Sequence, residues 1–225
     1  RTELSRLRDL DGDGVAERID TITDDWGLTD NYHEFAFGLP KDEAGNLYFS
    51  LNLAFLNPEW WHGKSNAPWR GWLMRCTPEG NVEPVASGFR SPAGVGMDTK
   101  GRLLVTDNQG DWMASSPIYA VQPGEFHGHP ASLHWTEAYG FGTTHPEDKT
   151  PPDVERVPPA IWIPYDWSRS TGNLVTDTTG GAFGPFEDQL FVAELTNGMV
   201  LRAELEDIEG VTQGAIWPFR TKVGS

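Results

Sequence analysis

The chain has 225 residues, with 17 basic and 33 acidic side chains, and therefore a formal charge of −16. This charge argues against binding to nucleic acids or anionic membranes, because phosphate recognition needs clustered Lys and Arg. The single cysteine, Cys76, excludes an intramolecular disulfide and a cysteine-based zinc finger. The sequence also contains no run of 18 apolar residues, so we expect no transmembrane helix in this chain.

Short apolar or alternating runs bounded by turn residues predict β-strands along the whole chain. The 25 Gly and 17 Pro residues are spread throughout and disfavour long helices. In chain order, the predicted strands are 3–9, 18–23, 35–41, 46–52, 71–77, 82–87, 93–98, 102–107, 117–121, 159–165, 171–177, 189–195, 199–205 and 214–219.

An internal repeat groups these strands. Residues 42–52 superpose on residues 98–108, and residues 186–194 are a degenerate third copy. Four-stranded units that repeat in this way predict an all-β fold, a β-propeller. The predicted units are a blade remnant at 1–24, a blade at 35–88, a blade at 93–165 with an insertion at 122–158, and a blade at 171–219. These make about three and a half blades, so we expect the chain to be part of a larger ring.

The blade arrangement predicts which loops share a face. The residues that lead into each innermost strand lie on the same face as the loops between the second and third strands. His33, Arg90 and Arg169 precede innermost strands, and the turn Gln109–Gly110–Asp111–Trp112 follows a second strand. We therefore expect these residues to converge on one mouth of the propeller.

The residues at this mouth suggest acid–base chemistry. A histidine such as His33 suits proton abstraction from a hydroxyl near neutral pH. Arg90 and Arg169 suit stabilisation of a developing oxyanion or binding of an anionic cofactor. The alternatives are a histidine that caps a strand and arginines that form ion pairs between blades.

Aromatic residues cluster in the loop 53–70, on the same predicted face. Trp60, Trp61 and Trp69 in this loop, together with Trp112, offer flat apolar surfaces on which a sugar ring can stack. The alternative for the loop is a hydrophobic plug between blades.

The segment from Asp9 to Asp20 has the spacing of a calcium loop. Oxygen ligands are expected from Asp9, Asp11, Asp13 and Val15, and Asp20 falls at the twelfth position, where a carboxylate closes the shell. The blade arrangement puts this loop on the face opposite His33, so a calcium ion here would be structural. The alternative is an acidic hairpin turn.

Three of the histidines in the insertion form a further candidate site. His127, His129 and His134 offer a metal cluster, but a Pro- and Gly-rich segment without nearby cysteine favours ordinary loop histidines.

Two stretches of the chain carry a resemblance to a known family. The stretches 88–94 and 98–110 resemble the soluble quinoprotein glucose dehydrogenase and sorbosone dehydrogenase family. Residues 6–9, 31–39, 126–130 and 181–186 are similar to a branch of predicted bacterial membrane-bound dehydrogenases. The resemblance implies a six-bladed propeller that uses pyrroloquinoline quinone (PQQ) and calcium.

The same resemblance implies roles for individual residues. His33 falls at the position of the family's general base, which takes the proton of the anomeric hydroxyl while hydride passes to the quinone. Arg90 falls at the arginine beside the quinone oxygens, and the turn Gln109–Gly110–Asp111 at the turn that holds the catalytic calcium, with Asp111 in place of proline. The family's lysine contact to the quinone carboxylates falls near residues 196–197, where this chain has Thr and Asn.

These observations predict a sugar or polyol dehydrogenase that works in the periplasm or outside the cell and passes electrons to a cytochrome c, in another domain or chain. One alternative is a carbohydrate lyase or hydrolase that uses the same mouth, with His33 abstracting a proton from a uronic acid. Another is a binding propeller stabilised by calcium and without catalysis.

Overall fold

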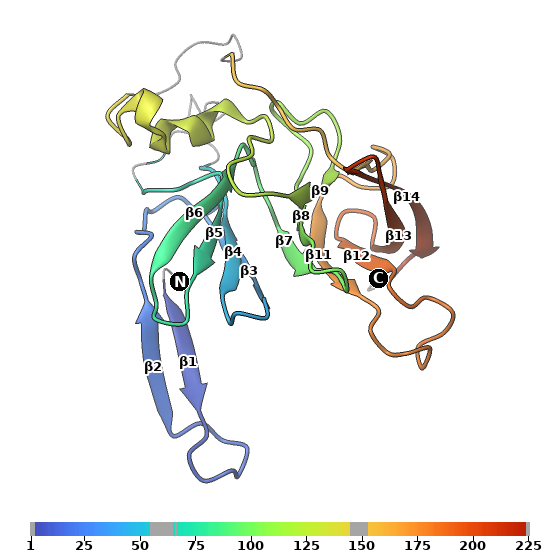
Figure 1. Ribbon diagram of the computed structural model, residues 1–225, viewed down its shortest axis with the longest axis horizontal. Helices are drawn as coiled ribbons and strands as arrows, with labels where there is room; N and C mark the ends of the chain where they lie inside the picture. The colour runs from blue at the N-terminus through green and yellow to red at the C-terminus, as the bar shows by residue number, and fades with distance from the viewer. Residues whose placement is uncertain (1–2, 55–64, 66, 145–152, 224–225) are drawn as a thin grey trace.

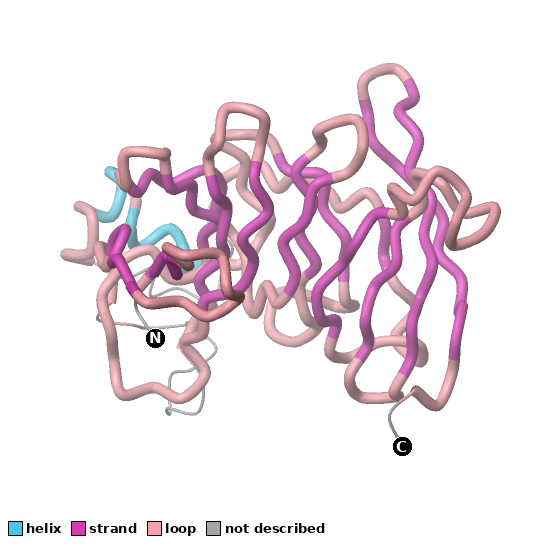
Figure 2. Tube along the Cα trace, turned by 90° about the horizontal axis from the view of Figure 1, so that it is seen from below, coloured by secondary structure: helices cyan, strands magenta, loops and turns pink. Residues whose placement is uncertain are grey.

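The computed structural model describes residues 3–54, 65, 67–144 and 153–223, and they form part of a β-propeller. Three four-stranded antiparallel sheets stand side by side, preceded by a two-stranded hairpin that extends away from them (Figure 1). The view from below shows the strands of successive sheets running alongside one another (Figure 2). The predicted fold class is thus confirmed.

Each sheet is built from consecutive strands, as expected for propeller blades. The hairpin consists of β1 (Leu4–Arg8) and β2 (Arg18–Thr23). The first blade contains β3 (Ala36–Lys41), β4 (Leu47–Leu51), β5 (Trp72–Cys76) and β6 (Val82–Ser87). The second contains β7 (Gly94–Met97), β8 (Leu103–Thr106), β9 (Pro117–Val121) and β10 (Ile161–Trp162). The third contains β11 (Thr171–Thr176), β12 (Leu190–Glu194), β13 (Met199–Ile208) and β14 (Val211–Arg220).

The internal repeat corresponds to one turn used twice. In the β3–β4 turn the Gly45 N–H donates to the Asp42 carbonyl, and in the β7–β8 turn the Gly101 N–H donates to the Asp98 carbonyl, both at 3.0 Å. Both glycines have positive φ, which residues with a side chain adopt at a cost. The sequence repeat therefore reports a shared backbone geometry.

Three strands differ clearly in length from the prediction. β10 covers only two residues, because Pro158, Pro159 and Pro164 on either side lack the N–H that a longer ladder needs. β13 and β14 are longer than predicted, because a two-residue turn with positive φ at Glu209 and Gly210 joins them directly.

The insertion of the second blade packs on the first blade. It contains the 3₁₀-helices η2 (Pro130–Trp135) and η3 (Glu137–Tyr139). The Trp72 indole N–H donates to the Ser132 carbonyl at 2.7 Å, and the Gly88 N–H donates to the Ser132 hydroxyl at 2.8 Å. His127 is fully buried, with its ring 4.8 Å from that of Phe89 and 4.3 Å from that of Tyr119. This histidine is therefore part of the core.

Apolar side chains fill the spaces between blades. One buried cluster joins the first and second blades around Leu73, Val95 and Val105, and another joins the second and third around Leu104 and Leu174. Burial of such clusters is the main favourable term in folding.

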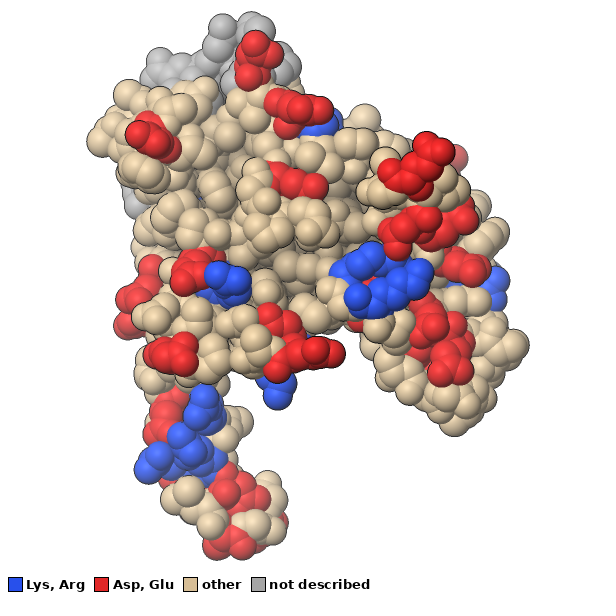
Figure 3. Space-filling view, viewed as in Figure 1, with Lys and Arg blue, Asp and Glu red and all other residues tan. Residues whose placement is uncertain are grey.

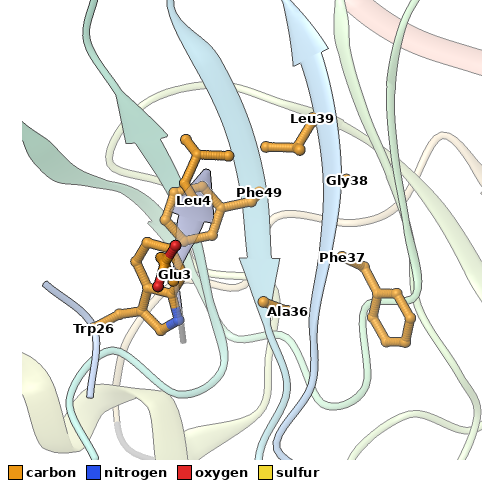
Figure 4. A pocket seen from close by; sticks show the side chains of 8 residues that line it. All are labelled: Glu3, Leu4, Trp26, Ala36, Phe37, Gly38, Leu39 and Phe49. Atoms are coloured by element: carbon orange, nitrogen blue, oxygen red, sulfur yellow. The ribbon is translucent and has the colours of Figure 1, made fainter. Parts of the chain in front are cut away.

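One groove lies between the hairpin and the first blade, and an apolar groove lies on the third blade. Leu4, Trp26 and Phe49 line the first groove, and Phe37 points away from them (Figure 4). Phe183, Phe191 and Phe219 line the second. No helix in the described part of the chain has the length and apolar character needed to cross a membrane.

Candidate functional site

His33 and Arg90 lie near each other at one end of the blades. His33 lies ahead of β3, and its Nδ1 is 3.1 Å from the Leu53 carbonyl oxygen. Its Nε2 lies 3.5 Å from the hydroxyl of Ser91, the neighbour of Arg90. The loops before the innermost strands of two blades therefore contribute to one site.

The surroundings of His33 favour the neutral form of its ring. Burial lowers the pKa of His33, the Leu53 hydrogen bond and Glu34 act in the opposite direction, and the positive charge of Arg90 lowers it further. Because the Leu53 carbonyl only accepts hydrogen bonds, Nδ1 carries the proton in the neutral ring and Nε2 carries the lone pair. Nε2 is therefore the atom that can accept a proton.

Arg90 lies against the turn that follows β8. Its Nε is 4.0 Å from Asp111 Oδ2, and the Arg90 side chain is 13% exposed. Gly110 has φ of +149°, and a Cβ at this position would lie 2.4 Å from Arg90 Nε. The absence of a side chain at Gly110 is thus what lets the guanidinium lie on the turn.

The turn itself is supported from two sides. The Gly110 N–H donates to the Met113 carbonyl at 2.8 Å, and the Met113 N–H donates to the Gly110 carbonyl at 3.0 Å. Arg156, from the end of the insertion, donates to the Trp112 carbonyl at 3.3 Å. The Gln109 N–H donates to the Ser116 hydroxyl at 3.2 Å. Gln109, Gly110, Asp111 and Trp112 are therefore held in one tight turn beside Arg90.

Asp111 has the properties of a metal ligand. Its Oδ2 is buried and accepts no hydrogen bond from the described residues. Burial raises the pKa of Asp111, and the charge of Arg90 opposes this shift. A buried carboxylate oxygen without a hydrogen-bond donor suits a hard cation such as calcium, which binds oxygen ligands. The turn thus fits the predicted ion through Asp111.

A PQQ cofactor fits only part of the site. Arg90 suits the quinone oxygens, because a guanidinium donates strong hydrogen bonds to developing negative charge. At the position predicted for the carboxylate contact, Asn197 is exposed and its amide donates to the carbonyls of Asp166 and Trp167. Asn197 therefore fixes a loop and supplies no positive charge.

Asp107, which the sequence analysis missed, holds the residues around His33 in place. It is fully buried, and its carboxylate accepts the N–H groups of Arg90, Ser91 and Asn108 at 2.8, 2.7 and 2.7 Å. Burial nevertheless raises its pKa to about 6. A signal was present in the sequence, because Asp107 lies within the repeated segment 98–108, but a repeat predicts a strand and not a side-chain contact.

A buried ion pair, also missed, fixes the segment that carries His33. Arg70 Nε is 3.7 Å from Glu34 Oε2, and the two side chains are 1% and 2% exposed. Arg70 also donates to the carbonyls of Glu34 and Gly27, both at 3.1 Å. Because a buried arginine must be paired, this contact ties the loop between Gly27 and Glu34 to the first blade.

Arg169 occupies the corresponding position in the third blade but a different environment. It is exposed, and its guanidinium lies 4.8 Å from the centre of the Tyr165 ring. Its backbone N–H donates to Glu194. The structure thus places Arg169 in a cation–π pair at the surface.

The structure describes two of the four tryptophans that were predicted to contact a sugar. Trp60 and Trp61 lie outside the described residues. Trp69 packs against the core of the first blade, with its ring 5.4 Å from that of Trp72. Trp112 is half-buried in the turn beside Arg90. For Trp69 the structure shows the packing alternative, whereas Trp112 lies at the predicted site.

The acidic loop of the β1–β2 hairpin gathers four carboxylates. The ligand atoms of Asp9, Asp11, Asp13 and Glu17 all lie within 4.8 Å of one another. The hairpin tip, with its acidic side chains, extends away from the blades (Figure 3). Val15 is exposed, and its N–H donates to Asp13 at 2.8 Å.

Asp20, which the spacing assigned to the closing ligand position, lies apart from this group. It forms ion pairs with Arg8 and Arg18 on the hairpin strands, the latter at 2.7 Å. The strand register explains the difference, because Asp20 lies within β2, whereas Glu17 remains in the loop. Glu17 therefore takes the position near the three aspartates that the spacing gave to Asp20.

Comparisons with known proteins bear on the fold. No protein-family model matches the chain, and no curated protein matches it by sequence. Among solved structures, a glucose dehydrogenase matches with a TM-score of 0.66 and 20% identity over 96% of this chain and 62% of its own. The apo form of the soluble aldose sugar dehydrogenase from Escherichia coli matches with a TM-score of 0.63 and 18% identity, over 93% of this chain and 61% of its own.

A third solved structure is the PQQ-bound form of the aldose sugar dehydrogenase from Streptomyces coelicolor. Its TM-score is 0.62 and its identity 16%, over 98% of this chain and 59% of its own. The chain has the fold of the soluble sugar dehydrogenases. It spans about three fifths of the length of the structures that it matches.

Proposed function

We propose that this chain carries the proton-accepting part of a sugar or polyol dehydrogenase that depends on PQQ. The observation that carries the proposal is that His33 lies beside Ser91 and near Arg90, which in turn lies beside Asp111, with Nε2 as the His33 atom that can accept a proton. The likeness of the fold to solved sugar dehydrogenases supports the proposal.

In this proposal His33 Nε2 accepts the proton of a substrate hydroxyl as the C–O bond gains double-bond character. Arg90 stabilises the negative charge that develops on oxygen, an effect that is strong in a site from which water is excluded. PQQ, when bound, supplies the acceptor for the hydride that leaves the same carbon. Loss of the proton and the hydride together leaves a carbonyl product, so the atoms and charges balance.

Calcium has two proposed positions. At the mouth, Asp111 and the backbone of Gly110 are the proposed ligands, with Gln109 and Arg90 beside the cofactor. In the hairpin, Asp9, Asp11, Asp13 and Glu17 are the proposed ligands of a structural ion. The hairpin tip lies away from the blades, so an ion there would act on stability and not on the reaction.

The remaining parts of the proposal concern the surroundings of the enzyme. We propose Trp112 as a contact for a carbohydrate at the rim of the mouth. A cytochrome c, in another domain or chain, is the proposed electron acceptor, and the periplasm or the cell exterior is the proposed location.

Reconstitution tests the proposed function. The complete protein, loaded with PQQ and calcium, should oxidise members of a broad sugar and polyol panel with an artificial electron-accepting dye. His33→Gln should lower kcat by roughly a hundredfold or more, because it removes the base. His134→Gln, which changes a histidine of the insertion, should retain the activity.

Two outcomes would contradict the proposal. One is no dye reduction by the loaded protein with any sugar of the panel. The other is an unsaturated sugar product that forms without an electron acceptor, which would assign the site to a lyase.

A further inference from the structure

Ser91 is held between two asparagines from neighbouring blades. Its hydroxyl oxygen is 3.0 Å from Asn52 Nδ2, at the end of the first blade's β4, and 3.3 Å from Asn108 Nδ2, after the second blade's β8. Ser91 itself is 3% exposed, and its N–H is bound by Asp107 at 2.7 Å. The position of this hydroxyl is therefore fixed from three directions.

The hydrogen bonds determine where the Ser91 proton points. A hydroxyl has two acceptor lone pairs and one donor hydrogen. The two asparagine N–H groups occupy the lone pairs, so the hydrogen is directed to the third neighbour, His33 Nε2, at 3.5 Å. The Leu53 carbonyl already requires the proton of the neutral ring on Nδ1, so Nε2 is an acceptor.

We propose that Ser91 is a positioning residue for His33, which fixes the orientation of the imidazole ring by its contact with the Nε2 lone pair. The role of His33 as a base rests on the proposed function, whereas the hydrogen bond between Ser91 and His33 does not. A substrate hydroxyl that gives its proton to Nε2 replaces the weak contact from Ser91.

The charged groups near His33 act separately from Ser91. Arg90 reaches the ring from the loop before β7, and Glu34 is the next residue in the chain, paired with the buried Arg70. Replacing Ser91 leaves all three charges in place. A change in the titration of His33 in such a variant therefore reports the lost hydroxyl contact.

Nuclear magnetic resonance of the ¹⁵N-labelled histidine rings tests the inference without any cofactor. The His33 signals are assigned by their loss in His33→Gln. In the unaltered protein we expect the tautomer with the proton on Nδ1. In Ser91→Ala we expect the His33 pKa to rise by about half a unit to one unit, because a donor to the neutral ring is removed.

Two variants serve as matched controls. Ser170→Ala removes the corresponding serine of the third blade, which follows Arg169 and has its N–H bound by Glu194, and it should leave the His33 pKa unchanged. Ser91→Thr keeps a hydroxyl and should restore the original pKa.

The inference is overturned if the unaltered protein carries the proton on Nε2, a result that needs no variant to fold. It is also overturned if folded Ser91→Ala and Ser170→Ala give the same His33 pKa as the unaltered protein. Absence of sugar oxidation together with the expected tautomer would instead overturn the proposed function alone.

Discussion

The second and third blades secure the residues ahead of their innermost strands in the same way, yet only one of the two becomes part of the site. Asp107 accepts the N–H groups of Arg90 and Ser91, and Glu194 accepts those of Arg169 and Ser170. Asp107 directly follows the second strand of its blade, and Glu194 is the last residue of the second strand of its own.

The environments of the two arginines explain the difference. Arg90 lies on Gly110 and beside Asp111, with 13% of its side chain exposed. Arg169 is exposed and stacks on Tyr165. The backbone hydrogen bonds to the acid therefore fix the main-chain position of each arginine in the same way. The turn opposite the arginine then determines whether its side chain is held in a partly buried place or exposed at the surface.

Replacing the two arginines tests this contrast most strongly. In the reconstituted protein, Arg90→Met should lower kcat/KM for sugar oxidation by roughly a hundredfold to a thousandfold, because charge stabilisation is lost in a buried place. Arg169→Met should lower it by no more than about threefold, because a surface charge is screened by water. Equal losses in steady-state assays would remove the distinction between the blades.

The buried carboxylate of Asp107 in the second blade should make the free energy of unfolding depend on pH. Because burial raises the pKa of Asp107 from 3.8 to about 6, the folded chain holds this proton more tightly than the unfolded chain. The protonated Asp107 therefore stabilises the folded chain at low pH. This stabilisation, about 3 kcal/mol in all, is lost as the pH rises from the unfolded-state pKa through the folded-state pKa.

Asp107→Asn removes this titration. Relative to this variant, the free energy of unfolding of the unaltered protein should fall by about 2 to 3 kcal/mol between about pH 4 and about pH 7. Urea denaturation at a series of pH values measures the difference, with the exposed Asp188→Asn as the control. A constant difference across the series would contradict the prediction.

Substitutions at two glycines distinguish an effect on the position of the Arg90 side chain from an effect on protein stability. A Cβ at Gly110 would meet the end of the flexible Arg90 side chain, which can move away, whereas a Cβ at Gly101 would meet open space. Gly110→Ala and Gly101→Ala should each cost about 1 kcal/mol of stability for their positive φ.

Only Gly110→Ala should lower sugar oxidation, by about tenfold, because it displaces the Arg90 guanidinium. Thermal unfolding and activity measured on the same preparations would test this. Similar activity of the two variants would show that the position of Arg90 on the turn is unimportant.

The smallest expected effect concerns the hairpin. Calcium at about ten times its dissociation constant should stabilise the chain by about 1.4 kcal/mol, seen as a rise in Tm. Asp11→Asn should reduce that rise and leave sugar oxidation unchanged, whereas Asp24→Asn, outside the acidic group, should keep it. An equal calcium response of the two variants would exclude the hairpin site.

The sequence by itself determined the fold class and the end of the molecule where the candidate site lies. Alternating apolar residues and Gly-containing turns specify strands locally, and the four-strand order then places His33, Arg90 and the 109–111 turn on one face. The two-residue β10 and the long β13–β14 hairpin differed, because prolines and a positive-φ turn limit or extend pairing in ways that alternation does not encode.

Only the tertiary structure decided which of these residues touch. The contact of His33 with Ser91, the burial of Asp107 and the pairing of Arg70 with Glu34 each join segments that are far apart in the chain. The exclusion of Asp20 from the acidic group depends likewise on strand register. Such contacts follow from how neighbouring blades pack, because burial and hydrogen-bond partners are properties of the assembled sheets and not of any local pattern.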